Sequence, residues 1–128
     1  MAAAPADYRP VAARTDKRPK ETSTWTVELE PTTDILQTLG AQRRDGQVLV
    51  GFAADEGEPG LDRAREKLVR KGVNLIVFND VSRDDVGFDT PENEVVLVSD
   101  GGERMVAKAP KAEIATAILD EVERVLDG

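Results

Sequence analysis

The chain has 128 residues, a length that suits one compact domain, and 33% of its residues are charged. It contains no cysteine and no histidine, which excludes disulfides, thiolate or imidazole metal sites and every Ser-His or Cys-His catalytic arrangement. The formal net charge of -8 argues against general nucleic-acid binding, and no apolar run reaches the roughly 20 residues that a membrane span needs. We therefore expect a cytoplasmic protein with no nucleic-acid partner and no membrane segment.

Basic side chains are unevenly distributed along this acidic chain. Ten of its 17 lysines and arginines lie in two windows, residues 9–20 and 63–71. Local basic patches in an acidic protein suit a small anionic ligand better than a polymer.

The first part of the chain has little regular pattern. Residues 1–6 are small and apolar and lead into Asp7 without a turn or capping signal, so the chain is predicted to open inside a strand. Residues 9–23 are polar and basic, with two prolines and no apolar periodicity, which predicts a long, mobile loop.

A strand and a short helix are predicted next. Residues 24–30 alternate between apolar and polar, as expected for a half-buried strand. The residues of its inward face are Trp25, Val27 and Leu29. Pro31 ends this strand, and Thr32 or Thr33 can cap the following helix. The apolar stripe of that helix consists of Ile35, Leu36 and Leu39.

Two buried strands flank an amphipathic helix in the middle of the chain. Residues 47–54 form a continuous apolar run, which predicts a central strand covered on both faces. A glycine-rich acidic loop leads to a helix over 61–71, which Gly72 closes. Residues 74–78 form another buried strand.

A hairpin and a helix complete the chain. Asp100, Gly101 and Gly102 lie between two strand-like segments, 92–99 and 103–109, which indicates an antiparallel hairpin. A final helix is predicted over 111–126. Its apolar residues recur at helical spacing: Ile114, Ile118, Val122 and Val125.

Buried strands that alternate with amphipathic helices predict an α/β fold. We expect a Rossmann-like domain of three layers, with a mainly parallel sheet, helices on both faces and an appended antiparallel hairpin. In such sheets ligands bind beyond the carboxyl ends of the strands, so residues 52–55 and 79–82 are favoured positions for a site.

Lys67 and Lys71 lie four residues apart on one predicted helix, so their ammonium groups project from the same face. One interpretation is a solvated helix face, with Asp62 and Glu66 as counter-charges. The other is that the two lysines bind a triphosphate, whose charge would offset their mutual repulsion.

Other charged residues also have two interpretations. Lys17 and Lys20 belong either to a solvated tether or to a loop that closes over a ligand and neutralises phosphate charge. Asp7 either caps a turn or approaches a ligand, and Asp34 either complements a helix dipole or lies at an anion-binding helix N-terminus. The chain has neither the glycine-rich dinucleotide fingerprint nor a Walker-type phosphate loop.

Eight segments occur in the order and with the spacing found in one known family. They are MAAAPADYRP, KRPK, TDIL, VGFAAD, KLVRK, FNDVS, GFDTPENE and KAEIATAILDEV. On these segments the chain resembles bacterial phosphopantothenoylcysteine synthetase over essentially its whole length, and specifically the C-terminal portion of its single CTP-binding synthetase domain.

The resemblance implies a ligase of coenzyme A biosynthesis. In that reaction CTP and 4'-phosphopantothenate give an acyl-cytidylate and pyrophosphate, and the amine of cysteine then displaces CMP to form 4'-phosphopantothenoylcysteine. The resemblance also implies Mg²⁺, a homodimer and no FMN in this part of the chain.

The resemblance assigns Lys17 as a catalytic residue of the mobile loop. It also implies a CTP site made of Met1, Ala2, Ala3, Asp7, Lys17, Thr33, Asp34, Ile35, Leu36, Phe52, Lys67 and Lys71. No metal ligand is implied.

The chain departs from the family pattern in four respects. Pro19, Thr33 and Asp55 stand where the family commonly has lysine, proline and glutamate. The family's N-terminal half, which carries an S-N-x-S-S-G-x-M-G segment, has no counterpart here, so we expect the domain to be incomplete at its N-terminus. The alternative to a ligase is therefore a truncated, non-catalytic nucleotide-binding or dimerisation module.

Overall fold

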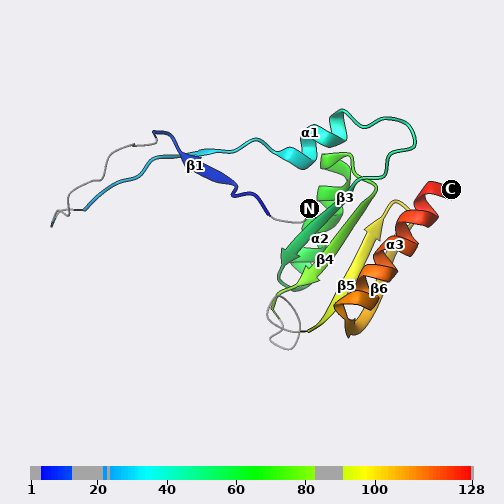
Figure 1. Ribbon diagram of the computed structural model, residues 1–128. Helices are drawn as coiled ribbons and strands as arrows, with labels where there is room; N and C mark the ends of the chain where they lie inside the picture. Colours follow the sequence, from blue (N-terminus) through cyan, green and yellow to red (C-terminus); the bar gives the residue numbers. More distant parts are fainter. Residues whose placement is uncertain (1–3, 13–21, 23, 83–90, 128) are drawn as a thin grey trace. The chain divides into compact units, whose positions relative to one another are not determined.

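The computed structural model describes residues 4–12, 22, 24–82 and 91–127. The chain divides into two compact units, Met1–Ile35 and Leu36–Gly128. Along the chain (Figure 1) the elements are β1 (Tyr8–Pro10), β2 (Leu29–Pro31), α1 (Ile35–Ala41), β3 (Val50–Asp55), α2 (Gly57–Lys71), β4 (Leu75–Asp80), β5 (Glu92–Ser99), β6 (Gly102–Pro110) and α3 (Lys111–Asp127). None of the described helices is long and apolar enough to cross a membrane.

The first unit is a two-stranded antiparallel arm. Arg9 of β1 lies opposite Glu30 of β2, and its Nε donates a hydrogen bond of 2.7 Å to a Glu30 carboxylate oxygen. The Thr32 hydroxyl donates a hydrogen bond of 2.6 Å to the carbonyl of Ala6 and so fastens the base of the arm. Arg9 and Pro10 therefore belong to a strand, although the sequence predicted that the loop begins at residue 9.

The strand predicted over 24–30 is shorter than expected, because the described strand β2 covers Leu29–Pro31. Its predicted inward face is also exposed: Trp25, Val27 and Leu29 are 59%, 47% and 56% accessible. The alternation is present in the sequence, but the face that it marks is exposed in the described arm, so the prediction of a half-buried strand is wrong for this unit.

The second unit contains a four-stranded mixed sheet in the order β3-β4-β5-β6. β3 and β4 are parallel, whereas β4–β5 and β5–β6 are antiparallel. The α/β class and the appended hairpin are confirmed, and the parallel part of the described sheet is the β3–β4 pair. Residues 81–91 are too few for the crossover of a dozen or more residues that a parallel β5 would need.

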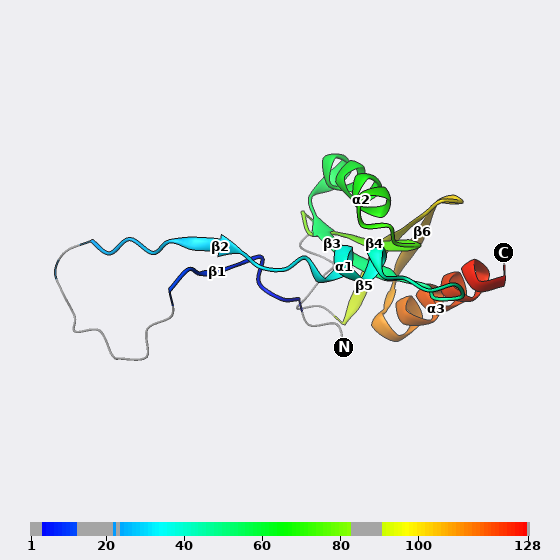
Figure 2. The same ribbon diagram turned by 90° about the horizontal axis from the view of Figure 1, so that it is seen from above.

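Helices cover both faces of this sheet, as predicted, and α2 and α3 lie on opposite sides of it (Figure 2). The core on the α2 side contains Ala53, Ala64, Leu68, Val73, Ile76, Phe78 and Val98. The core on the α3 side contains Leu75, Val77, Val95, Leu97 and Ile114. Consecutive residues of β4 alternate between the two cores, which confirms a strand buried on both faces.

β3 differs from the central strand that its apolar run predicted. In the described sheet it is an edge strand, and its buried residues are Gly51 and Ala53, on the α2 side. Phe52 points to the opposite face, where its side chain is 63% exposed. A continuous apolar run was therefore not sufficient to distinguish a central strand from an edge strand.

α1 and α2 approach each other closely at their C-terminal ends. A Cβ atom built on Gly40 of α1 would lie 1.9 Å from the carbonyl oxygen of Lys71, so only glycine fits there. Gly72 ends α2 with a φ of 62°, in the left-handed conformation that its C-terminal position requires. Leu36 of α1 packs against the core on the α2 side, which fixes α1 on that face of the sheet.

Candidate functional site

The two segments that the sequence favoured for a site lie side by side at the carboxyl ends of β3 and β4. In the parallel register Ala54 lies opposite Asn79, and Asp55 lies opposite Asp80. The amide of Val81 also donates a hydrogen bond of 3.0 Å to the carbonyl of Asp55. The two segments therefore adjoin at the carboxyl edge of the β3–β4 pair.

Asp55 is held as an ionised carboxylate at this edge. Arg63 of α2 donates two hydrogen bonds to it, from Nε at 2.7 Å and from Nη2 at 2.6 Å. This pairing, helped by the backbone N–H of Glu56 at 2.9 Å, lowers the pKa of Asp55 to about 2. A carboxylate of such low basicity is a poor proton acceptor near neutral pH, so Asp55 is a structural anchor and a poor candidate for a general base.

Asp80 joins the end of β4 to the start of α2. Its Oδ1 accepts hydrogen bonds from the amide of Gly57 at 3.1 Å, the amide of Ser82 at 2.9 Å and the Ser82 hydroxyl at 2.6 Å. Gly57 has a φ of 56°, a conformation that glycine adopts without strain. This carboxylate therefore fixes the turn after β4 against the first residue of α2.

Asn79 has a buried acceptor that the fold itself does not use. Its Oδ1 has no hydrogen-bond partner among the described residues. Buried amide oxygens are nearly always paired, because an unpaired one costs about 1–3 kcal/mol. The position of residues 79–82 after a strand and the family segment FNDVS both drew attention to this region, but Asn79 was not among the predicted site residues.

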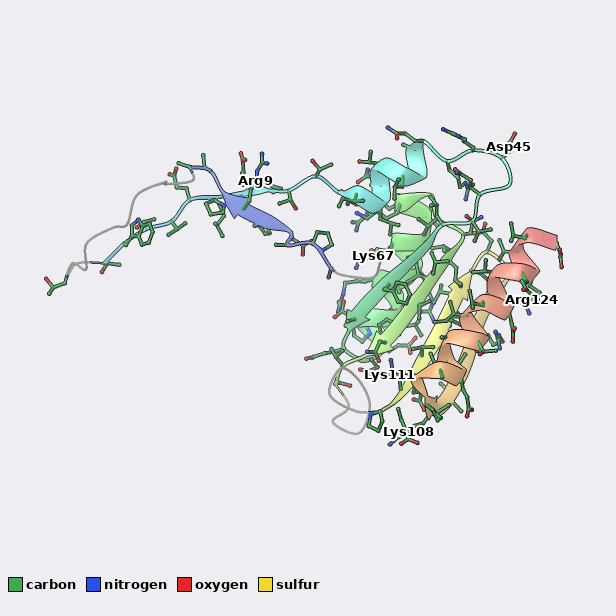
Figure 3. All side chains as sticks on the ribbon, in the orientation of Figure 1. Arg9, Asp45, Lys67, Lys108, Lys111 and Arg124 are labelled. Carbon is green, nitrogen blue, oxygen red and sulfur yellow. The ribbon has the colours of Figure 1, made fainter. Side chains whose placement is uncertain are left out.

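The lysine pair of α2 is on the same face of the sheet as α1. Lys67 and Lys71 are half-buried and one helical turn apart, and Figure 3 shows Lys67 among the side chains of this face. The backbone of Lys71 is the surface against which Gly40 packs. The structure thus places three predicted site residues, Leu36, Lys67 and Lys71, on adjoining elements.

The remaining predicted site residues are distributed differently. Phe52 projects from the face of β3 opposite to α2. The arm unit contains Asp7, Thr33, Asp34 and Ile35, which are all exposed. The following predicted residues lie outside the described part of the chain: Met1, Ala2, Ala3 and Lys17.

The described residues do not form a metal centre of their own. No group of three or more carboxylates among them is arranged to hold a metal ion. Asp55 and Asp80, the two aspartates at the carboxyl edge, are already engaged by Arg63, Gly57 and Ser82.

A parallel strand-helix-strand unit, with polar groups at its carboxyl edge and a lysine pair on its helix, defines a Rossmann-like α/β domain. Comparison with known families is more specific. The chain belongs to the DFP family, the DNA/pantothenate metabolism flavoprotein C-terminal domain, which it matches over residues 1–126.

Curated relatives are between 30% and 38% identical to this chain over the aligned residues. The coenzyme A biosynthesis bifunctional protein CoaBC of Bacillus subtilis is 38% identical over 121 residues, which cover 94% of this chain and 29% of that protein. The protein of the same name from Mycolicibacterium smegmatis is 37% identical over 134 residues, which cover 95% of this chain and 32% of that protein. The chain spans about three tenths of the length of these relatives.

A solved structure supports the same relationship. The crystal structure of the C-terminal domain of a coenzyme A biosynthesis bifunctional protein CoaBC matches with a TM-score of 0.71 and 34% identity. The match covers 98% of this chain and 52% of that chain. At this identity the resemblance to the synthetase family that the eight sequence segments indicated is confirmed.

Proposed function

We propose that this chain is the CTP-binding portion of a phosphopantothenate-cysteine ligase that acts in coenzyme A biosynthesis in the cytoplasm. The observation that carries the proposal is the match of nearly the whole chain to the C-terminal domain of CoaBC proteins. The lysine pair on α2 supports it independently, because two ammonium groups one turn apart suit a polyphosphate.

In the proposed reaction the carboxylate of 4'-phosphopantothenate attacks the α-phosphorus of CTP, and pyrophosphate leaves. The amine of cysteine then attacks the acyl carbon of the acyl-cytidylate, CMP leaves with the bonding electron pair, and the nitrogen loses a proton. Lys67 and Lys71 would hold the triphosphate, and Lys17 would act on the phosphates from its loop. Asp7, Phe52 and residues 33–36 would complete the nucleotide site, with Met1, Ala2 and Ala3.

In this proposal Mg²⁺ would bind together with the nucleotide. The described residues contain no acidic cluster that would hold it, so the triphosphate and water would supply its ligands. No step is assigned to the metal ion.

The first test is the affinity of the chain for CTP. Isothermal titration calorimetry should detect binding, and the double substitution Lys67→Ala with Lys71→Ala should weaken it by at least about a hundredfold, because two charge-assisted contacts are lost. The matched control is Lys108→Ala with Lys111→Ala, two lysines at the junction of β6 and α3. Equal affinity in the two double variants would contradict the triphosphate role.

The chain spans about three tenths of the length of its curated relatives, so CTP binding and catalysis need separate tests. A non-catalytic nucleotide-binding module is the second candidate function. It predicts CTP binding without release of pyrophosphate when 4'-phosphopantothenate and cysteine are added. The same assay on the intact gene product that carries these 128 residues should release pyrophosphate if the ligase proposal is correct, and its failure there would favour the second candidate.

A further inference from the structure

We propose that Asp80 is a specificity-determining residue, which excludes phosphate groups from the N-terminus of α2 and so directs the triphosphate toward Lys67 and Lys71. The inference rests on the proposed function for the identity of the anionic ligand. It goes beyond that function because it gives Asp80, at the carboxyl edge of the sheet, a role in ligand selection.

The N-terminus of α2 is where a phosphate would ordinarily be expected in this fold. The helix follows a parallel strand at the carboxyl edge of the sheet, and its first N–H groups and its dipole favour negative charge. Glu56, at the N-cap position, makes no side-chain hydrogen bond to the helix, so no local cap occupies these donors.

Two of the amides at this helix end donate instead to aspartates from the strand ends. The carboxylate of Asp55 accepts the N–H of Glu56, and that of Asp80 accepts the N–H of Gly57. The amide of Gly60 is already bonded to the carbonyl of Glu56 within the helix, at 3.1 Å. Asp80 is thus a protein carboxylate in the position that a ligand phosphate would take.

The charge around this helix end reinforces the exclusion. Four acidic side chains lie at the strand ends and in the first turn of α2: Asp55, Glu56, Glu58 and Asp80. The arginines nearby are engaged, since Arg63 pairs with Asp55, and Arg65 bonds to Glu58, Asp62 and Glu103. An incoming phosphate would therefore meet net negative charge at this end and two lysines near the other end of the helix.

The same pattern also stabilises the helix, because acidic groups near the N-terminus and basic groups near the C-terminus complement its dipole. A purely structural role predicts no change in anion selectivity when Asp80 is replaced. Exclusion predicts that the freed Gly57 amide becomes an anion site.

Amide chemical shifts in ¹H–¹⁵N spectra of the chain separate these roles when inorganic phosphate and CTP are titrated. In the wild type we expect phosphate to leave the Glu56 and Gly57 amides unmoved. In Asp80→Ala the Gly57 amide should shift saturably, with phosphate affinity at least about tenfold higher, because a like charge and an acceptor are both removed. Asp80→Asn keeps the acceptor oxygen and should keep the Gly57 amide closed to phosphate.

Two results would overturn the proposal. One is a saturable shift of the Gly57 amide when phosphate is added to the wild-type chain. This measurement does not depend on the folding of any variant. The other is an unresponsive Gly57 amide in an Asp80→Ala chain whose remaining spectrum is that of the folded protein. If CTP moves no amide of the wild type, the proposed function fails for this chain, while the phosphate titration still decides the role of Asp80.

Discussion

Asp55 shows how a single ion pair can make the stability of this chain depend on pH. Its pKa of about 2 lies below the ordinary value of 3.8, because Arg63 and the Glu56 amide favour the charged form. The unfolded chain therefore takes up this proton at a higher pH than the folded chain. The stabilisation from Asp55 is complete above about pH 4 and is lost as the pH falls toward 2.

The lowered pKa predicts how the stability of the Asp55→Asn variant depends on pH. Urea unfolding should show the variant less stable than the wild type at pH 7, with a difference that shrinks between pH 4 and pH 2. Arg63→Gln should show the same pH dependence, because it removes the main cause of the lowered pKa. A difference that stays constant down to pH 2 would contradict the assignment.

Glu121 is a charged residue with almost no exposure, at 2% accessible. Its carboxylate accepts hydrogen bonds from Arg124 at 2.6 Å and from Arg104 of β6 at 3.2 Å, and Arg104 also donates to the carbonyl of Ala117 at 3.0 Å. The group therefore fastens α3 to β6 through Arg104.

Neutralising this carboxylate should destabilise the chain. Glu121→Gln is expected to lower the free energy of unfolding by about 1–3 kcal/mol, because bonds between charged groups are replaced by weaker ones in a buried place. Glu123→Gln, two residues away and exposed, should change it by less than about 0.5 kcal/mol. Chemical denaturation followed by circular dichroism measures both, and equal effects would argue against a role for burial.

At the scale of the elements, the contact of α1 with α2 depends on the absence of one side chain. Gly40→Ala would place a methyl group 1.9 Å from the Lys71 carbonyl oxygen, where backbone must move to admit it. We expect a loss of about 1–3 kcal/mol in thermal or urea unfolding. Gly101→Ala, whose added carbon would have its nearest neighbour at 3.7 Å, should be close to neutral.

Several elements could be predicted from the sequence because one local signal determined each of them. The apolar spacing of α3 and the Asp100-Gly101-Gly102 turn gave the final helix and the hairpin, and Gly72 gave the end of α2. α2 begins at Gly57, four residues before the predicted start, because its N-terminus is capped by Asp80 from another strand. A cap from a distant residue leaves no local pattern.

The position of the candidate site could be predicted from the sequence, whereas its side-chain contacts could not. Strand ends in a parallel pair converge by topology, so residues 52–55 and 79–82 could be selected as a region. The pairing of Asp55 with Arg63 and the unpaired oxygen of Asn79 are set by tertiary packing around the strand ends. Neither follows from spacing along the chain.

For the whole molecule, the exposed apolar side chains of the arm support the proposal that the protein is a homodimer. Tyr8 and Val11 are 59% and 55% accessible, and the exposed residues Trp25, Val27 and Leu29 belong to the same unit. Large exposed apolar groups gathered on one small unit are typical of protein interfaces.

Sedimentation velocity should therefore show a dimer at micromolar concentrations. The double variant Trp25→Ser with Val27→Ser should raise its dissociation constant by at least about tenfold, because apolar area is lost from the interface. Val69→Ser is the control, since Val69 is 79% exposed on α2 and lies outside the arm. A wild-type monomer at the highest concentration studied would contradict the proposal.

The order β3-β4-β5-β6 also bears on how the second unit acquires its structure. Each strand of the described sheet pairs with the strand next to it in the sequence, so contacts form between segments that are close along the chain. Loop closure between such neighbours costs little conformational entropy, and proteins rich in local contacts fold quickly. The described strands can therefore pair in chain order, with α3 covering the second face of the sheet after β6 has joined it.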